Sequence, residues 1–355
     1  MISIENRFVL VDWKRRLTTM GCFLLSRLSK VVLLGFAIYH KNGTLFGAAA
    51  DSDAGVIISL DGDPKIVHRT FGEKELLVIR IEGKDGPSTT ASKEQLINDI
   101  FNDETIGVSK QFAACSKQQF LLQPAGGSPN IENGVITVEL ETVEGSTTQS
   151  IYREIERLSL NTDYFGRKLE EFDQVMICMP QGVVKPELNE QKNGGKWLAY
   201  VPTEMPYKNY MSIYNDEWCS SVSTGMHEIG HTIGLGHSGE ESSYDDVSGQ
   251  MGFSKKQQIG ADKCFNPAKS WQLGWYAKQS LRLDPLLDEM PVSTVLMGIT
   301  SDFDNDRTDS NSNKKHILLQ IYNGGASDDF YIGYNRRESF NAGTAKGQDM
   351  LLVNE

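Results

Sequence analysis

The sequence predicts an α/β fold with a mixed, mostly parallel sheet, followed by a β-rich C-terminal region. First, strand-length apolar runs such as 76–81 and 174–178 alternate with amphipathic helical segments up to about residue 218. This alternation is typical of a parallel sheet whose faces are covered by helices. Second, from about residue 290 the chain consists of successive strand-like segments. We therefore expect two regions of different construction.

Each element is predicted from its own pattern. A helix is expected over 92–101, where the apolar residues lie on one face, and another over 147–159, where Ile151, Ile155 and Leu158 form one stripe. Strands are expected where short apolar runs are bounded by turn residues. In chain order they cover 56–60, 66–67, 76–81, 118–122, 134–140, 174–178, 197–201, 211–214, 293–297, 317–322, 330–334 and 350–353.

Composition excludes several classes of protein. The 355 residues include 35 Lys and Arg against 47 Asp and Glu, which gives a formal net charge of −12. No basic stretch is present, so nucleic-acid binding is not expected as the main role, because phosphate contacts need clustered cations. No apolar run approaches the roughly 18 to 20 residues that span a bilayer. A stable membrane span is therefore not expected.

The N-terminal residues resemble a targeting segment. Residues 1–50 are interpreted as a leader or signal-like segment, because the nine apolar residues Val31–Tyr39 follow several basic ones. This favours secretion. An N-terminal membrane anchor and an extended or wrongly assigned N-terminus are the alternatives. Residues 51–72 are interpreted as a propeptide or N-terminal extension.

The segment Met226–His237 carries the chemistry that the sequence predicts. His227 and His231 are four residues apart, so on a helix both rings face the same way and can bind one Zn²⁺ ion. Glu228 is the candidate general base. Gly234 can adopt the positive φ that ends a helix, which lets His237 return as the third ligand. Three protein ligands leave one position for water, as a catalytic zinc site requires.

Coincidence is a poor explanation of this pattern. The chain has six histidines, and half of them fall in this one stretch, while His40, His68 and His316 are scattered without ligand spacing. A chance match to the five fixed positions has a probability of roughly 10⁻⁵ for a chain of this composition. The motif therefore predicts a metal site.

The long motif resembles that of the metzincin zinc endopeptidases, whose second signature is a methionine turn. Met251 stands fourteen residues after His237 in a matching segment. The segments 237–246 and 264–276 are similar, more specifically, to the gametolysin family (peptidase family M11), and the resemblance covers about residues 75–340. It implies a metzincin-type zincin fold with a catalytic domain over 73–288 and a β-rich region over 289–355. The strand-like 350–353 is consistent with a region that continues further.

The resemblance implies a zinc-dependent endopeptidase. One catalytic Zn²⁺ is held by His227, His231 and His237, the general base is Glu228, and Met251 packs below the metal. The implied partner is a protein substrate, an extracellular, cell-wall or matrix glycoprotein. Phe253 departs from the pattern, because several metzincins have a tyrosine two residues after the turn methionine. The alternatives are a catalytically inactive zinc-binding module of a wall or adhesion protein, and a non-peptidase zinc hydrolase.

Four of the five cysteines, Cys115, Cys178, Cys219 and Cys264, form an even set through the body of the chain. Such a set fits two disulfides in an oxidising compartment, and reduced buried thiols fit as well. The strand order of metzincins implies one pairing: Cys178 with Cys219 at one edge of the sheet, which leaves Cys115 for Cys264.

Overall fold

A computed structural model describes residues 2–3, 38–39, 45–46, 70–102, 106–185, 197–202, 210–239, 242–252, 262–284, 294–301, 315–322 and 329–355. The chain forms two compact units. The central unit comprises Pro64–Ser238 and Phe253–Ala261, and the C-terminal unit comprises Met1–Asp63, Gly239–Gly252 and Asp262–Glu355. The leader-like segment lies almost wholly outside the described residues. The expected strands at 56–60 and 66–67 lie wholly outside them. Among those that are described, no helix is long and apolar enough to cross a membrane.

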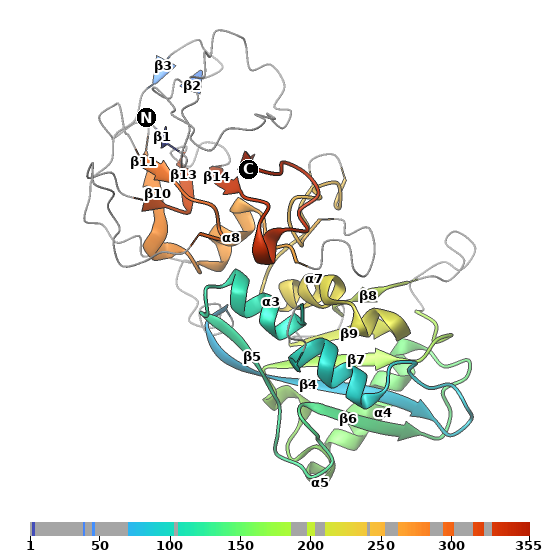
Figure 1. Cartoon of the computed structure of the whole chain (residues 1–355). Coiled ribbons are helices and arrows are strands. Elements are labelled where there is room, and N and C mark those ends of the chain that lie inside the picture. The colour runs from blue at the N-terminus through green and yellow to red at the C-terminus, as the bar shows by residue number, and fades with distance from the viewer. Residues whose placement is uncertain are drawn as a thin grey trace. The chain divides into compact units, whose positions relative to one another are not determined.

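A six-stranded sheet organises the central unit (Figure 1). Its longest strand, β4 (Gly72–Gly83), pairs in parallel with β7 on one side and with β5 and then β6 on the other. Beyond β7 lies β9, again parallel, and the short edge strand β8 is antiparallel to β9. The remaining strands are β5 (Phe120–Pro124), β6 (Val135–Leu140), β7 (Gln174–Met179), β8 (Ala199–Tyr200) and β9 (Met211–Asn215). The predicted α/β class with a mostly parallel sheet is confirmed.

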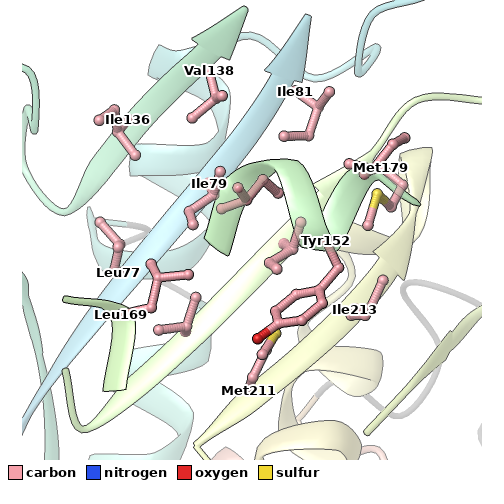
Figure 2. Close-up of a cluster of buried hydrophobic side chains, with 14 of the residues drawn as sticks. Leu77, Ile79, Ile81, Ile136, Val138, Tyr152, Leu169, Met179, Met211 and Ile213 are labelled. Atoms are coloured by element: carbon pink, nitrogen blue, oxygen red, sulfur yellow. The ribbon is translucent and has the colours of Figure 1, made fainter. Parts of the chain in front are cut away.

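One face of this sheet is covered by α4 (Thr148–Ser159). Thr147 caps this helix, since its side chain accepts a hydrogen bond from the N–H of Ser150. Ile151 and Ile155 of the predicted stripe belong to one buried cluster with alternate residues of the central strands, including Leu77, Ile79 and Ile213, and Leu158 packs against this cluster partly buried. Figure 2 shows part of the cluster, with Tyr152 of α4 among the strand residues. The sheet is therefore fixed on this side by a continuous apolar core. Two short helices, α5 (Thr162–Phe165) and η2 (Leu169–Glu171), follow α4.

The remaining helices of the central unit pack among themselves and against the strands. They are α2 (Lys93–Ile97), the π-helical turn η1 (Asn98–Asn102), α3 (Val108–Cys115), η3 (Asp216–Ser220) and α7 (Val222–Thr232). The helix expected over 92–101 thus begins after its cap Ser92 but changes to π geometry at Asn98. The helix α3 was not predicted. It contacts both β5 and α7.

The C-terminal unit is rich in strands, as the sequence predicts. Its four-stranded sheet has the order β10-β13-β14-β15, in which only the pair β10–β13 is parallel. These strands are β10 (Ser280–Leu283), β13 (Leu318–Ile321), β14 (Phe330–Asn335) and β15 (Met350–Asn354). The unit also contains α8 (Pro267–Leu273), η4 (Ala277–Gln279), η5 (Ser339–Asn341), β11 (Thr294–Leu296), β12 (Lys315–His316), and the two-residue strands β1 (Ile2–Ser3), β2 (Ile38–Tyr39) and β3 (Leu45–Phe46).

Candidate active site

The helix α7 presents the first two histidines of the motif. Its N-cap is Ser221, whose hydroxyl accepts a hydrogen bond from the N–H of Thr224. It passes close to α3 at Gly225, where an added Cβ would lie 2.9 Å from a methyl group of Val108. A larger residue there would require the Val108 side chain or α3 to shift. Gly225 therefore fixes the depth at which α7 lies in the central unit.

Gly234 ends the helix as the sequence predicts. Its φ is +102°, a conformation that side chains other than hydrogen strongly disfavour. The N–H of Gly234 donates to the carbonyl of His231 at 3.0 Å, and the N–H of Leu235 donates to the carbonyl of Gly230 at 2.9 Å. These two bonds reverse the chain in the manner of a helix C-cap. His237 is carried back by this reversal.

The three histidines converge through their Nε2 atoms. Nε2 of His231 lies 3.1 Å from Nε2 of His227 and 3.0 Å from Nε2 of His237. A ligand atom of each of the three lies within 4.8 Å of the others. His227 and His231 are half-buried and His237 is exposed, so the cluster is open to solvent. The structure thus brings together the three residues that the sequence predicts as ligands.

The protonation of His231 is set by a backbone group. Its Nδ1 lies 2.8 Å from the carbonyl oxygen of Leu235, which can only accept, so Nδ1 carries the proton. In the neutral ring, Nε2 then presents a lone pair to the other two histidines. Lone pairs at this spacing repel one another unless a cation or a proton lies between them. The donor set therefore fits a metal ion, and the Leu235 carbonyl is the partner that orients one ligand.

Glu228, which follows His227 directly in α7, is buried. The residue is 7% exposed, and its Oε2 atom has no hydrogen-bond partner among the described residues. Burial raises the pKa of Glu228 to about 8, and the positive charge of Lys185 acts in the opposite direction. Tyr214 on β9 is fully buried, and this burial is the main reason why its pKa is raised. The negative charge of Glu228 is the second reason, so the two side chains interact electrostatically. A carboxyl held in this way is suited to proton transfer.

A comparison with protein families identifies the family of this chain. The model of the gametolysin peptidase M11 family matches residues 74–289, which is more than half of the chain. This chain belongs to the gametolysin peptidase family. It is accordingly a peptidase. A comparison with curated proteins finds no match.

Two other residues, Met251 and Phe253, belong to the gametolysin-like pattern. Met251 belongs to the C-terminal unit, where its side chain is fully buried. Its role below the metal stays a prediction. Phe253 lies outside the described residues.

A disulfide anchors the chain just before the helix that carries the histidines. It joins Cys178 at the end of β7 to Cys219 in η3, with Cα atoms 5.5 Å apart. The two strands concerned, β7 and β9, run parallel with Cys178 opposite Tyr214, which is the order that the gametolysin resemblance implied. Cys115 and Cys264 are disulfide-bonded as well. Their pairing with each other stays a prediction.

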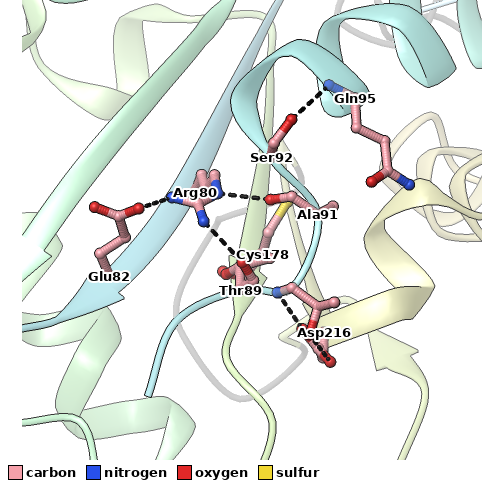
Figure 3. A network of polar contacts seen from close by, with 9 residues as sticks. Arg80, Glu82, Thr89, Ala91, Ser92, Gln95, Cys178 and Asp216 are labelled. Atoms are coloured by element: carbon pink, nitrogen blue, oxygen red, sulfur yellow. Dashed lines mark hydrogen bonds and ion pairs between the residues drawn. The ribbon is translucent and has the colours of Figure 1, made fainter. Parts of the chain in front are cut away.

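A polar network holds the same end of the sheet (Figure 3). The carboxylate of Asp216 accepts hydrogen bonds from the N–H of Thr90 at 2.7 Å and from its hydroxyl at 2.9 Å. Arg80 donates to the carbonyls of Thr89 and Ala91, and pairs with Glu82. The hydroxyl of Thr89 donates to the carbonyl of Cys178. The loop that precedes α2 is therefore tied to the strand end and to the turn that leads into α7.

Sequence analysis missed three contributors to the site: the Leu235 carbonyl, Lys185 and Tyr214. The carbonyl has no sequence signal, because any residue supplies one. Lys185 stands far from the motif along the chain, and neither Lys185 nor Tyr214 has a spacing that indicates a site. Only Tyr214 could have been suspected, since it lies on the last strand before the helix that carries the motif.

Proposed function

We propose that this gametolysin-family peptidase is a zinc-dependent metalloendopeptidase. The observation that carries the proposal is the convergence of three Nε2 atoms, with separations of 3.0 and 3.1 Å about His231 and with the proton of that ring committed to Leu235. Nitrogen ligands from three histidines, with space left for water, are a donor set that zinc favours in hydrolases. When bound, zinc would polarise the scissile carbonyl and lower the pKa of its water ligand to about 7.

Glu228 is assigned as the general base. It follows the ligand His227 directly, is held in a buried position, and keeps one carboxylate oxygen free of hydrogen bonds among the described residues. It would accept the proton of the attacking water and pass it to the amine that leaves. Burial raises its pKa to about 8 against the opposing charge of Lys185, and a bound zinc ion would add a second positive charge that favours the carboxylate form.

The substrate is proposed to be an extracellular, cell-wall or matrix glycoprotein. The support for a location outside the cell is the disulfide-bonded state of Cys115, Cys178, Cys219 and Cys264, because disulfides persist in oxidising compartments. The support for a glycoprotein is the family resemblance. An inactive zinc-binding module would have lost a ligand or the base, whereas this chain keeps all four residues.

The experiment is a protein-degradation gel with the wild-type chain and the Glu228→Gln variant, each with and without a chelator. Glu228→Gln should retain zinc and lose activity by about 10²- to 10⁴-fold, since it removes the proton acceptor and leaves the ligands. Glu217→Gln is the matched control, because it makes the same chemical change at an exposed position on η3. It should remain fully active. Undiminished activity of Glu228→Gln, or wild-type activity that survives complete zinc removal, would contradict the proposal.

A further inference from the structure

The helix α7 carries polar side chains on two neighbouring stripes. His227 and His231 form one stripe, and Glu228 and Thr232 form the other, because residues four apart lie on the same side of a helix. The second stripe is rotated by about 100° from the first. Glu228 and Thr232 are both buried. The stripe of Glu228 and Thr232 therefore faces the interior of the central unit.

The side of the sheet opposite α4 carries buried polar residues on β9. Met211 and Ile213 belong to the apolar cluster on the α4 side. Because successive residues of a strand point to opposite faces, Ser212 and Tyr214 lie on the other side. Both of these residues are almost inaccessible to solvent, at 1% and 0% exposed. This face of the sheet thus presents a buried serine and a buried tyrosine.

A hydrogen bond shows that α7 lies over this same face. The hydroxyl of Thr232 donates to Oε1 of Gln174 on β7 at 2.7 Å. Gln174 precedes Val175, which belongs to the apolar cluster on the α4 side, so the side chain of Gln174 points the other way, as that of Tyr214 does. The stripe of Glu228 and Thr232 therefore meets the face of the sheet that carries Tyr214.

The helix α7 crosses this face in the direction opposite to β7. Cys219, just before the helix, is bonded to Cys178 near the end of β7, whereas Thr232, the last residue of the helix, contacts Gln174 at the start of β7. About 6 Å of helix axis separates Glu228 from Thr232, which is the length of about two strand residues. Glu228 consequently lies over the middle part of the strands.

Two buried polar atoms on these facing surfaces have no hydrogen-bond partner among the described residues. They are the hydroxyl of Tyr214 and Oε2 of Glu228. Buried polar atoms are nearly always hydrogen-bonded. After burial, the negative charge of Glu228 is the next cause of the raised pKa of Tyr214, and the side chain of Ser212 acts in the opposite direction. With its pKa raised, the phenol keeps its proton and can donate, whereas a carboxylate can only accept. The two groups are therefore complementary.

We propose that Tyr214 is a positioning residue for the general base. Its hydroxyl donates toward the carboxylate of Glu228, through one ordered water or after a small rotation of either side chain, and holds it in the orientation that takes the proton of the attacking water. The inference rests on the proposed function, in which Glu228 is that base. Because Tyr214 is fully buried, it acts on the reaction only through Glu228.

The variant Tyr214→Phe tests the proposal, because it removes the hydroxyl and keeps the ring. Tyr152→Phe is the matched control. Tyr152 is 2% exposed in α4 and belongs to the cluster on the other side of the sheet, and its hydroxyl also donates to a glutamate, Glu156, at 2.9 Å. The two variants thus make the same chemical change in buried tyrosines on opposite faces of one sheet.

The first measurement is cleavage of labelled casein by the zinc-loaded full chain. Tyr214→Phe should lower kcat by about tenfold, which is the lower end of the effect of losing a residue that orients a group at a metal site. KM and zinc affinity should stay within twofold, because the hydroxyl supports the base and neither the substrate nor a ligand. A merely structural role of Tyr214 would instead weaken zinc binding or raise KM as well. Tyr152→Phe should leave all three quantities within twofold.

The second measurement does not depend on activity. In the zinc-free protein, Tyr214→Phe should lower the urea midpoint by about 0.3 M, because the buried carboxylate loses its donor. In the background of Glu228→Ala the same change should leave the midpoint where it is, since the acceptor is already gone.

Four results would overturn the inference. They are a kcat of Tyr214→Phe within twofold of wild type, an equal loss of kcat in Tyr152→Phe, a loss of kcat that is accompanied by weaker zinc binding or a raised KM, and an equal shift of the urea midpoint in both backgrounds. Failure of the proposed function is distinguishable from these. A zinc-loaded wild-type chain that cleaves no casein, or full activity of Glu228→Gln, would refute the function, while the midpoint comparison would still decide whether Tyr214 holds Glu228.

Discussion

Gly234 offers a clean test of how the backbone at the end of α7 shapes the metal site. Its φ of +102° permits the turn that brings the Leu235 carbonyl to His231 and returns His237 to the other ligands. An added Cβ would have open space, because no described heavy atom lies within 4 Å of it. The substitution Gly234→Ala therefore changes backbone energy and introduces no steric clash.

The expected cost follows from that conformation. A residue with a Cβ at positive φ costs about 1–3 kcal/mol when its surroundings hold it there. The chain can avoid this strain only by loosening the helix end, which gives up the bond from Leu235 N–H to Gly230 at about 1 kcal/mol. Either route lowers the free energy of unfolding by a similar amount. Loosening also withdraws the carbonyl that orients His231, which should weaken zinc binding by about 10- to 100-fold.

Gly127→Ala is the matched control. Gly127 has a φ of +107°, also with no described heavy atom within 4 Å of an added Cβ, and it lies in the loop after β5, far along the chain from the histidines. The two variants should lose similar stability in urea denaturation of the zinc-free protein. Only Gly234→Ala should lose zinc affinity in a chelator competition.

Two results would refute this reasoning. If Gly234→Ala is as stable as wild type, the positive φ is not required in solution. If both variants lose stability and neither loses zinc affinity, the turn at Gly234 does not position the ligands, and the hydrogen bond from His231 to Leu235 has no role in metal binding.

Two further predictions concern stability. Replacing Cys178 and Cys219 together by Ala should lower the free energy of unfolding by about 4 kcal/mol, because the disulfide closes a loop of 41 residues and so restricts the unfolded chain. A loss below about 1 kcal/mol in urea denaturation would contradict this chain-entropy estimate. Burial lowers the pKa of Lys263 to about 8, against the opposing charge of Asp246, so between about pH 8 and 10.5 the unfolded chain binds a proton that the folded chain does not. Stability should therefore rise with pH across this window by about 3 kcal/mol, and Lys263→Met should abolish the rise; equal slopes in both proteins would refute this assignment.

The cluster of three histidines could be predicted from sequence because its geometry is local. Two histidines four residues apart share a face on any helix, and Gly234 can reverse the chain wherever such a helix ends. The strands were predictable for a similar reason, since runs such as 174–179 are buried on both faces and need apolar residues throughout. In both cases a short stretch of chain carries the whole signal.

The remainder depends on contacts between distant residues, which a single sequence does not reveal. The helix α3 begins at Gly107 without a side-chain cap, and it contacts α7 and β5, so tertiary packing accounts for its position more than local preference does. The helix predicted over 92–101 was too regular, because the backbone widens to π geometry at Asn98. Lys185 and Tyr214 reach Glu228 only through the topology of the sheet.

The active-site helix is constrained at both of its ends by different physical means. Before its start, Asp216 has a φ of +45°, and its carboxylate is occupied by Thr90, while the disulfide at Cys219 ties the same turn to β7. After its end, Gly234 sets the direction of the chain. A helix of eleven residues is marginal by itself in water, so its precision must come from these attachments. The spacing of His227 and His231 is consequently a property of the helix, whereas the position of the two histidines is a property of the fold around it.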